Sequence, residues 1–241
     1  MLVLSLFSLL LPTATFAATL HRNHTCYVPA GALKTPAPLS SPSSPPRYVT
    51  VGIGVQNYTC SPSGNYTSVG AVAELFDISC LYGKPEFVEI QNDAFNIWSN
   101  CPSIDPLERG LRHAVHNRWH IDVIGQHYFV NETGVLLPKF DFTSTGVNKG
   151  DPDAFVVAKK TADVPAPNHH DDVDWLELER LSGDLANEVF RVYTREGQPP
   201  SSCTPGSASI SIKYTAQYCM YLSPDHFIRA VVDPRFLGFE V

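Results

Sequence analysis

The chain has 241 residues, which is enough for one sizeable hydrophobic core even after a leader is removed. Its 17 Lys and Arg residues against 24 Asp and Glu give a formal net charge of −7. Nucleic-acid-binding proteins carry basic patches, so this balance argues against a nucleic-acid partner.

Residues 1–17 have the pattern of a secretory signal peptide. An apolar stretch from Leu2 to Leu11 is followed by small residues, and cleavage after Ala17 or Ala18 fits the pattern. A membrane-spanning helix takes about 20 apolar residues, and neither this stretch nor any later one is that long. We therefore expect a secreted protein, in the extracellular space or the lumen of the secretory pathway, without a membrane span.

Two further features agree with export. In an oxidising compartment the even set of six cysteines indicates up to three disulfides, and none of the six forms a Cys-X-X-Cys pair typical of zinc or redox sites. Asn-X-Thr sequons are glycosylation sites in a secreted chain. The expected glycosylation sites are Asn23, Asn57, Asn65 and Asn131, and the cysteines are Cys26, Cys60, Cys80, Cys101, Cys203 and Cys219.

Residues 18–47 are expected to form an N-terminal arm that precedes a single β-rich domain over residues 48–241. Within the arm, residues 35–46 read TPAPLSSPSSPP, a Pro/Ser-rich run typical of an extended linker. Cys26 comes before this run. A disulfide from Cys26 would therefore tie the arm back onto the body of the protein.

The first predicted strand covers residues 48–60, YVTVGIGVQNYTC, in which apolar and small or polar residues alternate. A second strand is predicted at residues 69–76, and turn formers between the two strands favour a hairpin. We predict that a Cys60–Cys80 disulfide spans this hairpin, and we leave the pairing of the other cysteines open. Asn57 would share the buried side with Val55 in a straight strand, so either the strand bulges there or the sequon is not used.

The Gly52-X-Gly54 pair begins like a dinucleotide-binding loop, which needs a third glycine and then a helix that faces the pyrophosphate. Asn57 stands at the third position, and strand and turn residues follow it. The sequence therefore predicts no nicotinamide-dependent dehydrogenase and no cofactor. Instead, Gly52 and Gly54 lie on one face of the strand with Gln56, where an aromatic ring or a ligand packs close to the backbone.

Further strands are predicted from period-two patterns at residues 127–130, 139–142, 155–159, 188–194 and 209–221. Two short helices are predicted at residues 106–119 and 174–181. Strands at short spacing with turn residues between them indicate a mainly β protein, an antiparallel β-sandwich or barrel with one or two short helices. A doubly wound α/β fold would need a helix after most strands.

Two histidine-containing clusters are candidate sites. His113, His116 and His120 would lie on one face of a helix, but neighbouring arginines repel a cation, so we expect no metal and keep the three histidines only as a weak alternative. The second cluster is His169-His170-Asp171-Asp172, followed by Asp174. Here Asp172 or Asp174 is interpreted as the N-cap of the predicted helix at 174–181.

A dispersed set of polar residues supplies the remaining candidates. No Gly-X-Ser-X-Gly motif is present, so no hydrolase nucleophile is indicated. Polar side chains on apolar strands can line a pocket and orient a ligand, and a histidine can act as an acid or base. The candidate catalytic residues are His127, Asp141, Lys160 and Asp174, and the candidate ligand-binding residues are Gly52, Gly54, Gln56 and Trp175.

A resemblance to a known family covers residues 28–222 and is carried by residues 54–60, 69–80, 125–129, 158–160, 164–167, 173–176, 192–194, Cys203 and 214–218. Together these segments resemble domain-of-unknown-function family 3455, a group of secreted fungal and bacterial proteins. Fungal members often carry the label malate dehydrogenase, which no residue pattern in this chain supports. The chain departs from the family in a longer segment at residues 85–124 and in Cys219-Met220, where aromatics are usual.

Three functions follow from these observations. The first is a secreted, disulfide-bonded glycoprotein whose β-domain binds an apolar or aromatic small molecule. The second is a cofactor-free cyclase, isomerase or pericyclase of fungal secondary metabolism, because such enzymes act through shape and a few hydrogen bonds. The third is a secreted protein that interacts with a host or a cell wall through an exposed apolar patch.

Overall fold

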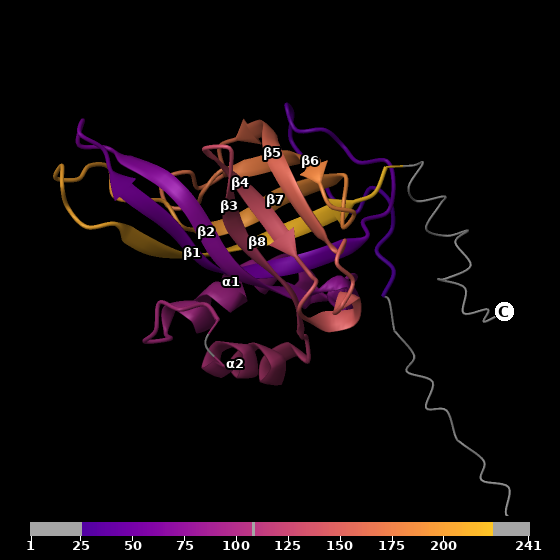
Figure 1. The fold of residues 1–241 in the computed structure, drawn as a ribbon. Helices are drawn as coiled ribbons and strands as arrows, with labels where there is room; N and C mark the ends of the chain where they lie inside the picture. Colours follow the sequence, from indigo (N-terminus) through magenta and orange to yellow (C-terminus); the bar gives the residue numbers. More distant parts are fainter. Residues whose placement is uncertain (1–25, 108, 224–241) are drawn as a thin grey trace, which may run out of the picture.

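A computed structural model describes residues 26–107 and 109–223, and the predicted signal peptide and the sequon at Asn23 lie outside these residues. Eight antiparallel strands form a closed barrel (Figure 1). The strands are β1 (Tyr48–Cys60), β2 (Tyr66–Asp77), β3 (Val123–Glu132), β4 (Val135–Asp141), β5 (Phe155–Val164), β6 (Trp175–Ser182), β7 (Glu188–Glu196) and β8 (Ile210–Tyr221). The helices are α1 (Pro85–Ser99) and α2 (Arg109–Trp119), with short 3₁₀ turns at Ser79–Leu81 and Gly146–Asn148.

Each strand pairs with its neighbour in sequence, and β1 pairs with β8 to close the barrel. The predicted fold class is confirmed, and the barrel is the form that the chain adopts. The described residues contain no helix with the length and apolar character needed to cross a bilayer.

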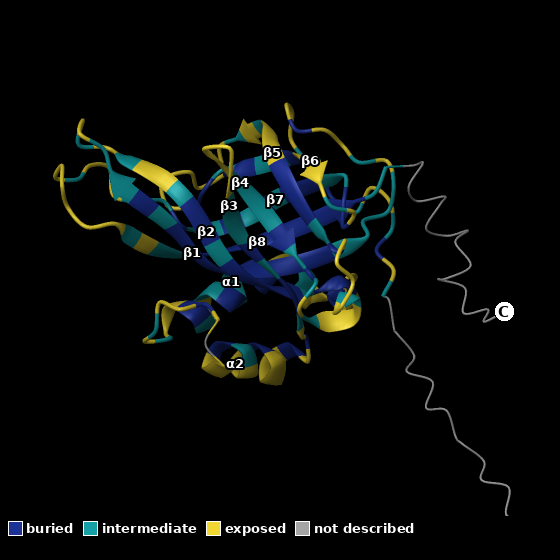
Figure 2. Ribbon diagram, viewed as in Figure 1, coloured by how far each residue is buried: buried dark blue, intermediate teal, exposed yellow. Residues whose placement is uncertain are grey.

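Strand β1 separates two hydrophobic clusters because its side chains alternate between the two faces of the sheet. Val51 and Ile53 face outward and pack with residues of the arm, α1 and α2. The opposite face looks into the barrel, where large side chains such as Tyr214 and Phe140 fill the interior. Because both faces are covered, much of the length of the strands is buried, as the dark blue segments in Figure 2 show.

Helix α1 lies on the outer wall of the barrel beside β1, β7 and β8. Pro85 occupies the helix start, where its missing N–H costs nothing, and Ile90, Ala94 and Trp98 follow at four-residue spacing on the buried face. This helix was not predicted from the sequence, although its proline start and the spacing of its buried residues are both visible there.

The outward polar residues of β8 bond to α1 rather than to solvent. Thr215 Oγ1 donates to the carbonyl of Gln91 at 2.6 Å, and Gln217 Nε2 donates to the carbonyl of Phe87 at 3.0 Å. Lys213 Nζ donates to the carbonyl of Trp98 at 3.0 Å. These bonds fix α1 along the strand.

The two predicted helices have different outcomes. The one at residues 106–119 is confirmed as α2, which begins at Arg109. The one at residues 174–181 is wrong, because these residues form β6, paired with β5 and β7. Asp172 and Asp174 therefore cap no helix. Leu, Glu and Arg favour helices locally, but the ladder on both sides overrides that preference.

The ladder between β1 and β2 shifts register between Asn57 and Tyr58, which matches the bulge that was one of the two alternatives expected at this position. Asn57 is half-buried, and its Oδ1 accepts a hydrogen bond from the hydroxyl of Ser211 at 2.7 Å. Asn65 and Asn131 are exposed. These two positions are accessible to glycosylation.

The predicted Cys60–Cys80 disulfide is wrong. The structure pairs Cys26 with Cys80 and Cys60 with Cys203, and Cys101 and Cys219 are free. Cys60 pairs with Tyr66 near the hairpin turn, whereas Cys80 follows the far end of β2. At about 3.3 Å per residue these ends lie much farther apart than a disulfide allows. The expectation that Cys26 ties the arm to the body is confirmed.

Candidate functional site

A cavity of about 520 Å³ lies between the N-terminal arm, the first turn of α1 and the outer wall of the barrel. We call it the arm pocket. The arm supplies Val28, Ala32 and Leu33, and α1 supplies Phe87 and Val88. Val28 and Leu33 are buried although they lie in an irregular segment, because the Cys26–Cys80 disulfide holds this part of the arm against the barrel.

The barrel side of the arm pocket is formed by the outward faces of β1, β7 and β8. It includes Val49, Cys219 and Tyr221, all less than 5% exposed. Burial raises the pKa of the Cys219 thiol to about 12 and also raises the pKa of Tyr221. Both groups are therefore neutral at physiological pH, and this wall carries no charge.

Gln217 is the buried amide of this wall, and its hydrogen bonds go to α1. Its Nε2 donates to the carbonyl of Phe87 and, at 2.9 Å, to Oε1 of Gln91. The rim of the pocket is more exposed, because 37% of Tyr82 and 62% of Val88 is accessible to solvent. Lys84, the residue before α1, is also exposed at the rim. The arrangement is a mostly apolar cavity whose rim carries an aromatic ring and one lysine.

Tyr193 enters the arm pocket from an unusual backbone conformation. It has a φ of 48°, a region that bulky residues rarely adopt, and it lies where the β7–β8 register shifts between Val192 and Arg195. Its ring meets the ring of Trp175 edge-on, with centroids 5.0 Å apart. Strained residues of this kind concentrate at functional sites, because the surrounding structure must hold them in place.

The three predicted ligand-binding residues on β1 face the barrel interior, away from the arm pocket. A Cβ added at Gly52 would lie 2.5 Å from Cε2 of Tyr218, and one added at Gly54 would collide with the carbonyl of Val72. The side chain that approaches Gly52 is therefore an aromatic ring of the barrel. Gln56 is 5% exposed, and its Nε2 has no hydrogen-bond partner among the described residues.

The fourth predicted ligand-binding residue, Trp175, lies outside the barrel at the start of β6. It packs in the same outer cluster as the arm and touches the pocket through Tyr193. Its Nε1 is buried and has no hydrogen-bond partner in the described part of the chain. Trp175 supports the pocket wall and does not line the cavity itself.

Among the predicted catalytic residues, His127 lies inside the barrel. Its ring stacks on Phe140 with centroids 4.4 Å apart, and its Nδ1 is 3.0 Å from the carbonyl of Lys139. A carbonyl only accepts, so Nδ1 carries the proton and Nε2 is the basic nitrogen. Burial lowers the pKa of His127 to about 4, because the bond to the Lys139 carbonyl opposes it only in part and the nearby Arg191 lowers the pKa further.

The other three catalytic candidates lie elsewhere. Asp141 is on the opposite side of β4 from Phe140, where it accepts hydrogen bonds from Tyr128 at 2.7 Å and from Thr143. Burial raises the pKa of Asp141, but the hydrogen bonds from Thr143, Tyr128 and Lys139 outweigh it and lower the pKa to about 2. This carboxylate is stably ionised and pairs with Lys139 at 3.0 Å.

Lys160 and Asp174 have structural contacts. Lys160 forms an exposed ion pair with Asp163 at 2.7 Å, and the backbone carbonyl of Asp174 accepts two N–H bonds from the guanidinium of Arg191. The structure thus places His127 inside the barrel and the side chains of Asp141 and Lys160 outside it on separate strands, while Asp174 precedes β6. The four candidates do not form a catalytic constellation.

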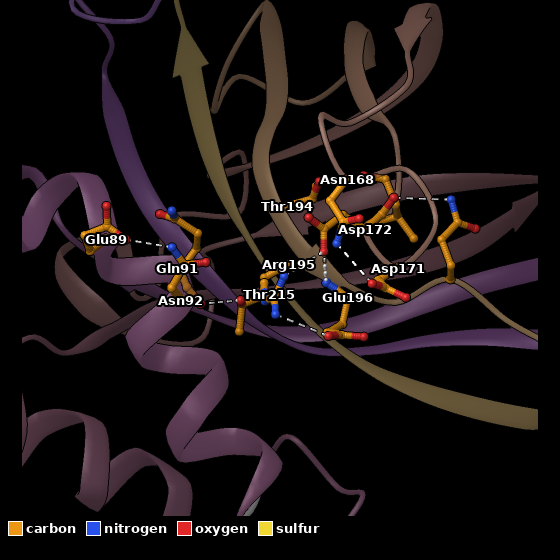
Figure 3. A network of polar contacts seen from close by, with 12 residues as sticks. Glu89, Gln91, Asn92, Asn168, Asp171, Asp172, Thr194, Arg195, Glu196 and Thr215 are labelled. Atoms are coloured by element: carbon orange, nitrogen blue, oxygen red, sulfur yellow. Dashed lines mark hydrogen bonds and ion pairs between the residues drawn. The ribbon is translucent and has the colours of Figure 1, made fainter.

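The cluster His169-His170-Asp171-Asp172 lies before β6, and its Asp172 joins the start of β6 to the end of β7. Oδ1 of Asp172 accepts the N–H of Glu196 at 2.6 Å, and the hydroxyl of Thr194 donates to the carbonyl of Val173 (Figure 3). Arg195 lies 3.7 Å from Asp172. The physical role of Asp172 is to hold the bulged end of β7, the segment that carries Tyr193.

The three histidines of the weak metal alternative lie on and just after α2. Nδ1 of His116 is 2.8 Å from Oδ1 of Asp122, and the rings of His116 and His120 meet edge-on at 5.9 Å. His120 has a φ of 55° and lies past the helix end. Within residues 26–107 and 109–223, no group of three or more His, Cys, Asp and Glu has a metal-binding arrangement.

The arm pocket was not predicted from the sequence. One signal was present, because Cys219 and Tyr221 continue the face of β8 that carries the polar residues Lys213, Thr215 and Gln217. Two apolar positions at the end of a polar face indicate that something covers it. The arm and α1 provide that cover, but their docking is not visible in strand periodicity.

The family model described as "Protein of unknown function (DUF3455)" matches residues 41–222. The match covers well over half of the chain, so the chain belongs to this family. The resemblance found in the sequence is confirmed, and the label malate dehydrogenase has no support. No curated protein and no solved structure matches the chain.

Proposed function

We propose that this DUF3455 protein is a secreted, disulfide-bonded β-barrel that binds an apolar or aromatic small molecule in the arm pocket. The observation that carries the proposal is the cavity itself, about 520 Å³, whose lining is mostly apolar or neutral and carries one charged residue, Lys84, at the rim. Small-molecule sites are typically concave and mostly apolar, with volumes of about 300–1,000 Å³. Tyr82 and Phe87, whose rings meet edge-on, provide aromatic surface at its mouth.

The proposed site is not the ligand-binding face of β1 that was predicted from the sequence. The face of β1 with Gly52, Gly54 and Gln56 looks into an interior occupied by Tyr214, Tyr218 and other large side chains. The opposite face of the same strand carries Val49, which lines the arm pocket. The proposed ligand therefore lies on the other side of β1.

A binding role is favoured over the cyclase or isomerase alternative. The predicted acid and base candidates are dispersed over the interior and the surface of the barrel, and none of them lines the arm pocket. The buried thiol of Cys219 is protonated and so is a poor nucleophile. The two disulfides support the secreted location, because such bonds persist in oxidising compartments.

The test uses N-phenyl-1-naphthylamine, a neutral aromatic dye whose fluorescence rises in apolar surroundings. The full-length secreted protein should bind it saturably at one site. Ala32→Trp places an indole in the cavity from the arm, and it should weaken dye binding by about tenfold or more.

The matched control is Ala114→Trp, which adds the same ring at an exposed position of α2 outside the arm pocket. This variant should bind the dye like the unmodified protein. Equal binding by both variants, or dye binding that does not saturate, would contradict the proposal.

A further inference from the structure

A second cavity of about 530 Å³ lies along α2 and is separate from the arm pocket. We call it the α2 cleft. Arg109, Arg112, His113 and His116 line one side of it, and the rest of the lining includes Thr145, Gly146 and one acidic residue, Asp122. Residues spaced three and four apart share a helix face, so these four cationic or imidazole side chains form one row.

The opposite wall is held in place by tight packing. Gly146 has a φ of 68°, and a Cβ there would lie 2.9 Å from Cα of Ile124. Thr145 donates its hydroxyl to the carbonyl of Val123 at 3.3 Å. The floor includes the apolar residues Ile121 and Val123, so the cleft combines a basic side with an apolar base.

Two members of the basic row already have an acidic partner. Arg112 donates to Oε1 of Glu74 at 2.6 Å, and this carboxylate is fully buried. His116 pairs with Asp122 at 2.8 Å. Among the described residues Arg109 and His113 have no such partner, and both are exposed. One permanent positive charge and one imidazole of the row are therefore available to a ligand.

We propose that the α2 cleft binds small organic acids, with the anionic group at Arg109 and His113 and the apolar body against Ile121 and Val123. The planar guanidinium of arginine matches the oxygens of a carboxylate or a phosphate group. The imidazole adds an N–H donor. In a chain with a net charge of −7, this row is a local exception that favours an anion. The inference does not depend on the arm pocket.

The experiment measures binding of phenyl phosphate, benzoate and the neutral analogue phenol by NMR titration of the full-length protein at low ionic strength. Both anions should shift amide signals of α2, and phenol should not. Binding should weaken as sodium chloride rises from about 20 mM to about 300 mM, because salt screens charges. The tighter of the two anions identifies whether the cleft takes phosphate or carboxylate ligands.

Two variants assign the binding to the cleft. Arg109→Gln should weaken the tighter anion by about tenfold or more, because a charge-assisted hydrogen bond is lost. Arg118→Gln is the matched control, since Arg118 is on the same helix but outside the cleft lining. His113→Gln should give a smaller loss than Arg109→Gln.

Three results would overturn the proposal: no binding of either anion, binding of phenol as tight as that of the anions, or equal losses in Arg109→Gln and Arg118→Gln. The Ala32→Trp variant separates the two sites, because it changes the arm pocket and should leave anion binding unaltered. Loss of dye binding therefore says nothing about the α2 cleft, and loss of anion binding says nothing about the arm pocket.

Discussion

His127 shows how a single buried side chain couples the fold to pH. Its pKa is about 4 in the folded protein and about 6.5 in the unfolded chain, because burial disfavours the imidazolium. Between these two values the unfolded chain binds more protons. The stability from the neutral histidine is therefore complete above pH 6.5 and is lost as pH falls toward 4.

We predict that the free energy of unfolding falls by about 3 kcal/mol between pH 7 and pH 4 because of His127. Urea denaturation at a series of pH values measures this slope. His127→Gln should flatten it, whereas His113→Gln, which changes an exposed histidine, should not. An unchanged slope in His127→Gln would show that another group is responsible. Asp141, with a pKa of about 2, acts only in a more acidic window.

At the residue scale, the sequence predicted which strand face a side chain lies on better than it predicted what the side chain does. It placed Gly52, Gly54 and Gln56 on one face and anticipated a close approach to the backbone, which Tyr218 makes. It also anticipated a bulge as one of two possibilities at Asn57. It did not reveal which face of β1 borders a cavity, because both faces of this strand are buried.

At the scale of elements, helix α1 and strand β8 act as one unit. The hydroxyl of Thr215 donates to the carbonyl of Gln91, and Thr215 is fully buried. The neighbouring Lys213 lies 4.3 Å from the centre of the Trp98 ring, a cation–π contact that ties the end of the helix to the same strand.

We predict that Thr215→Val lowers the free energy of unfolding by about 1 kcal/mol, because it removes one buried hydrogen bond while the shape is kept. Thr67→Val is the control, since Thr67 is exposed on β2 and a surface substitution changes stability by less than about 0.5 kcal/mol. Denaturant titration measures the free energy of unfolding of both variants, and its dependence on denaturant concentration should be the same in each. If the two variants are equally stable, the bond to α1 contributes nothing.

Elements with strict alternation could be predicted from the sequence, and those decided by distant contacts could not. The strand at residues 210–221 alternates cleanly and was found. The strand at residues 175–182 reads WLELERLS, whose residue types favour a helix, and only its two neighbouring strands make it extended.

At the scale of the whole molecule, the two disulfides have different tasks. Cys26–Cys80 fastens the arm that forms one wall of the arm pocket, whereas Cys60–Cys203 joins the β1–β2 hairpin to the connection before β8. Their sequence separations are 54 and 143 residues. Closing loops of this length stabilises a protein by about 4–5 kcal/mol in the chain-entropy description.

We predict that both double variants, Cys26→Ser with Cys80→Ser and Cys60→Ser with Cys203→Ser, lose several kcal/mol of stability, about 4 kcal/mol for the first. Only the first should also weaken binding of the neutral dye, because only its bond holds the pocket wall. Dye titration under conditions where both variants are folded distinguishes them. Equal dye affinity in the two variants would show that the arm does not shape the site.

The arm pocket could not be predicted from the sequence because its walls come from several segments that are distant in the chain. The arm, the start of α1 and the outer faces of β1 and β8 meet only in the folded chain. The α2 cleft was partly visible, since His113 and His116 were noted together with their neighbouring arginines. The neighbouring arginines entered only as an argument against a metal, whereas two of them, Arg109 and Arg112, line the cleft for which we propose an anion.

Closure of the barrel through β1 and β8 has a consequence for synthesis. Tyr48 pairs with Met220, so the first strand to leave the ribosome waits for the last one before its ladder is complete. Pairings between such distant residues form slowly, because a long stretch of chain must be ordered first. Until then β1 is paired only with β2, and its other edge stays open to pairing with a neighbouring chain.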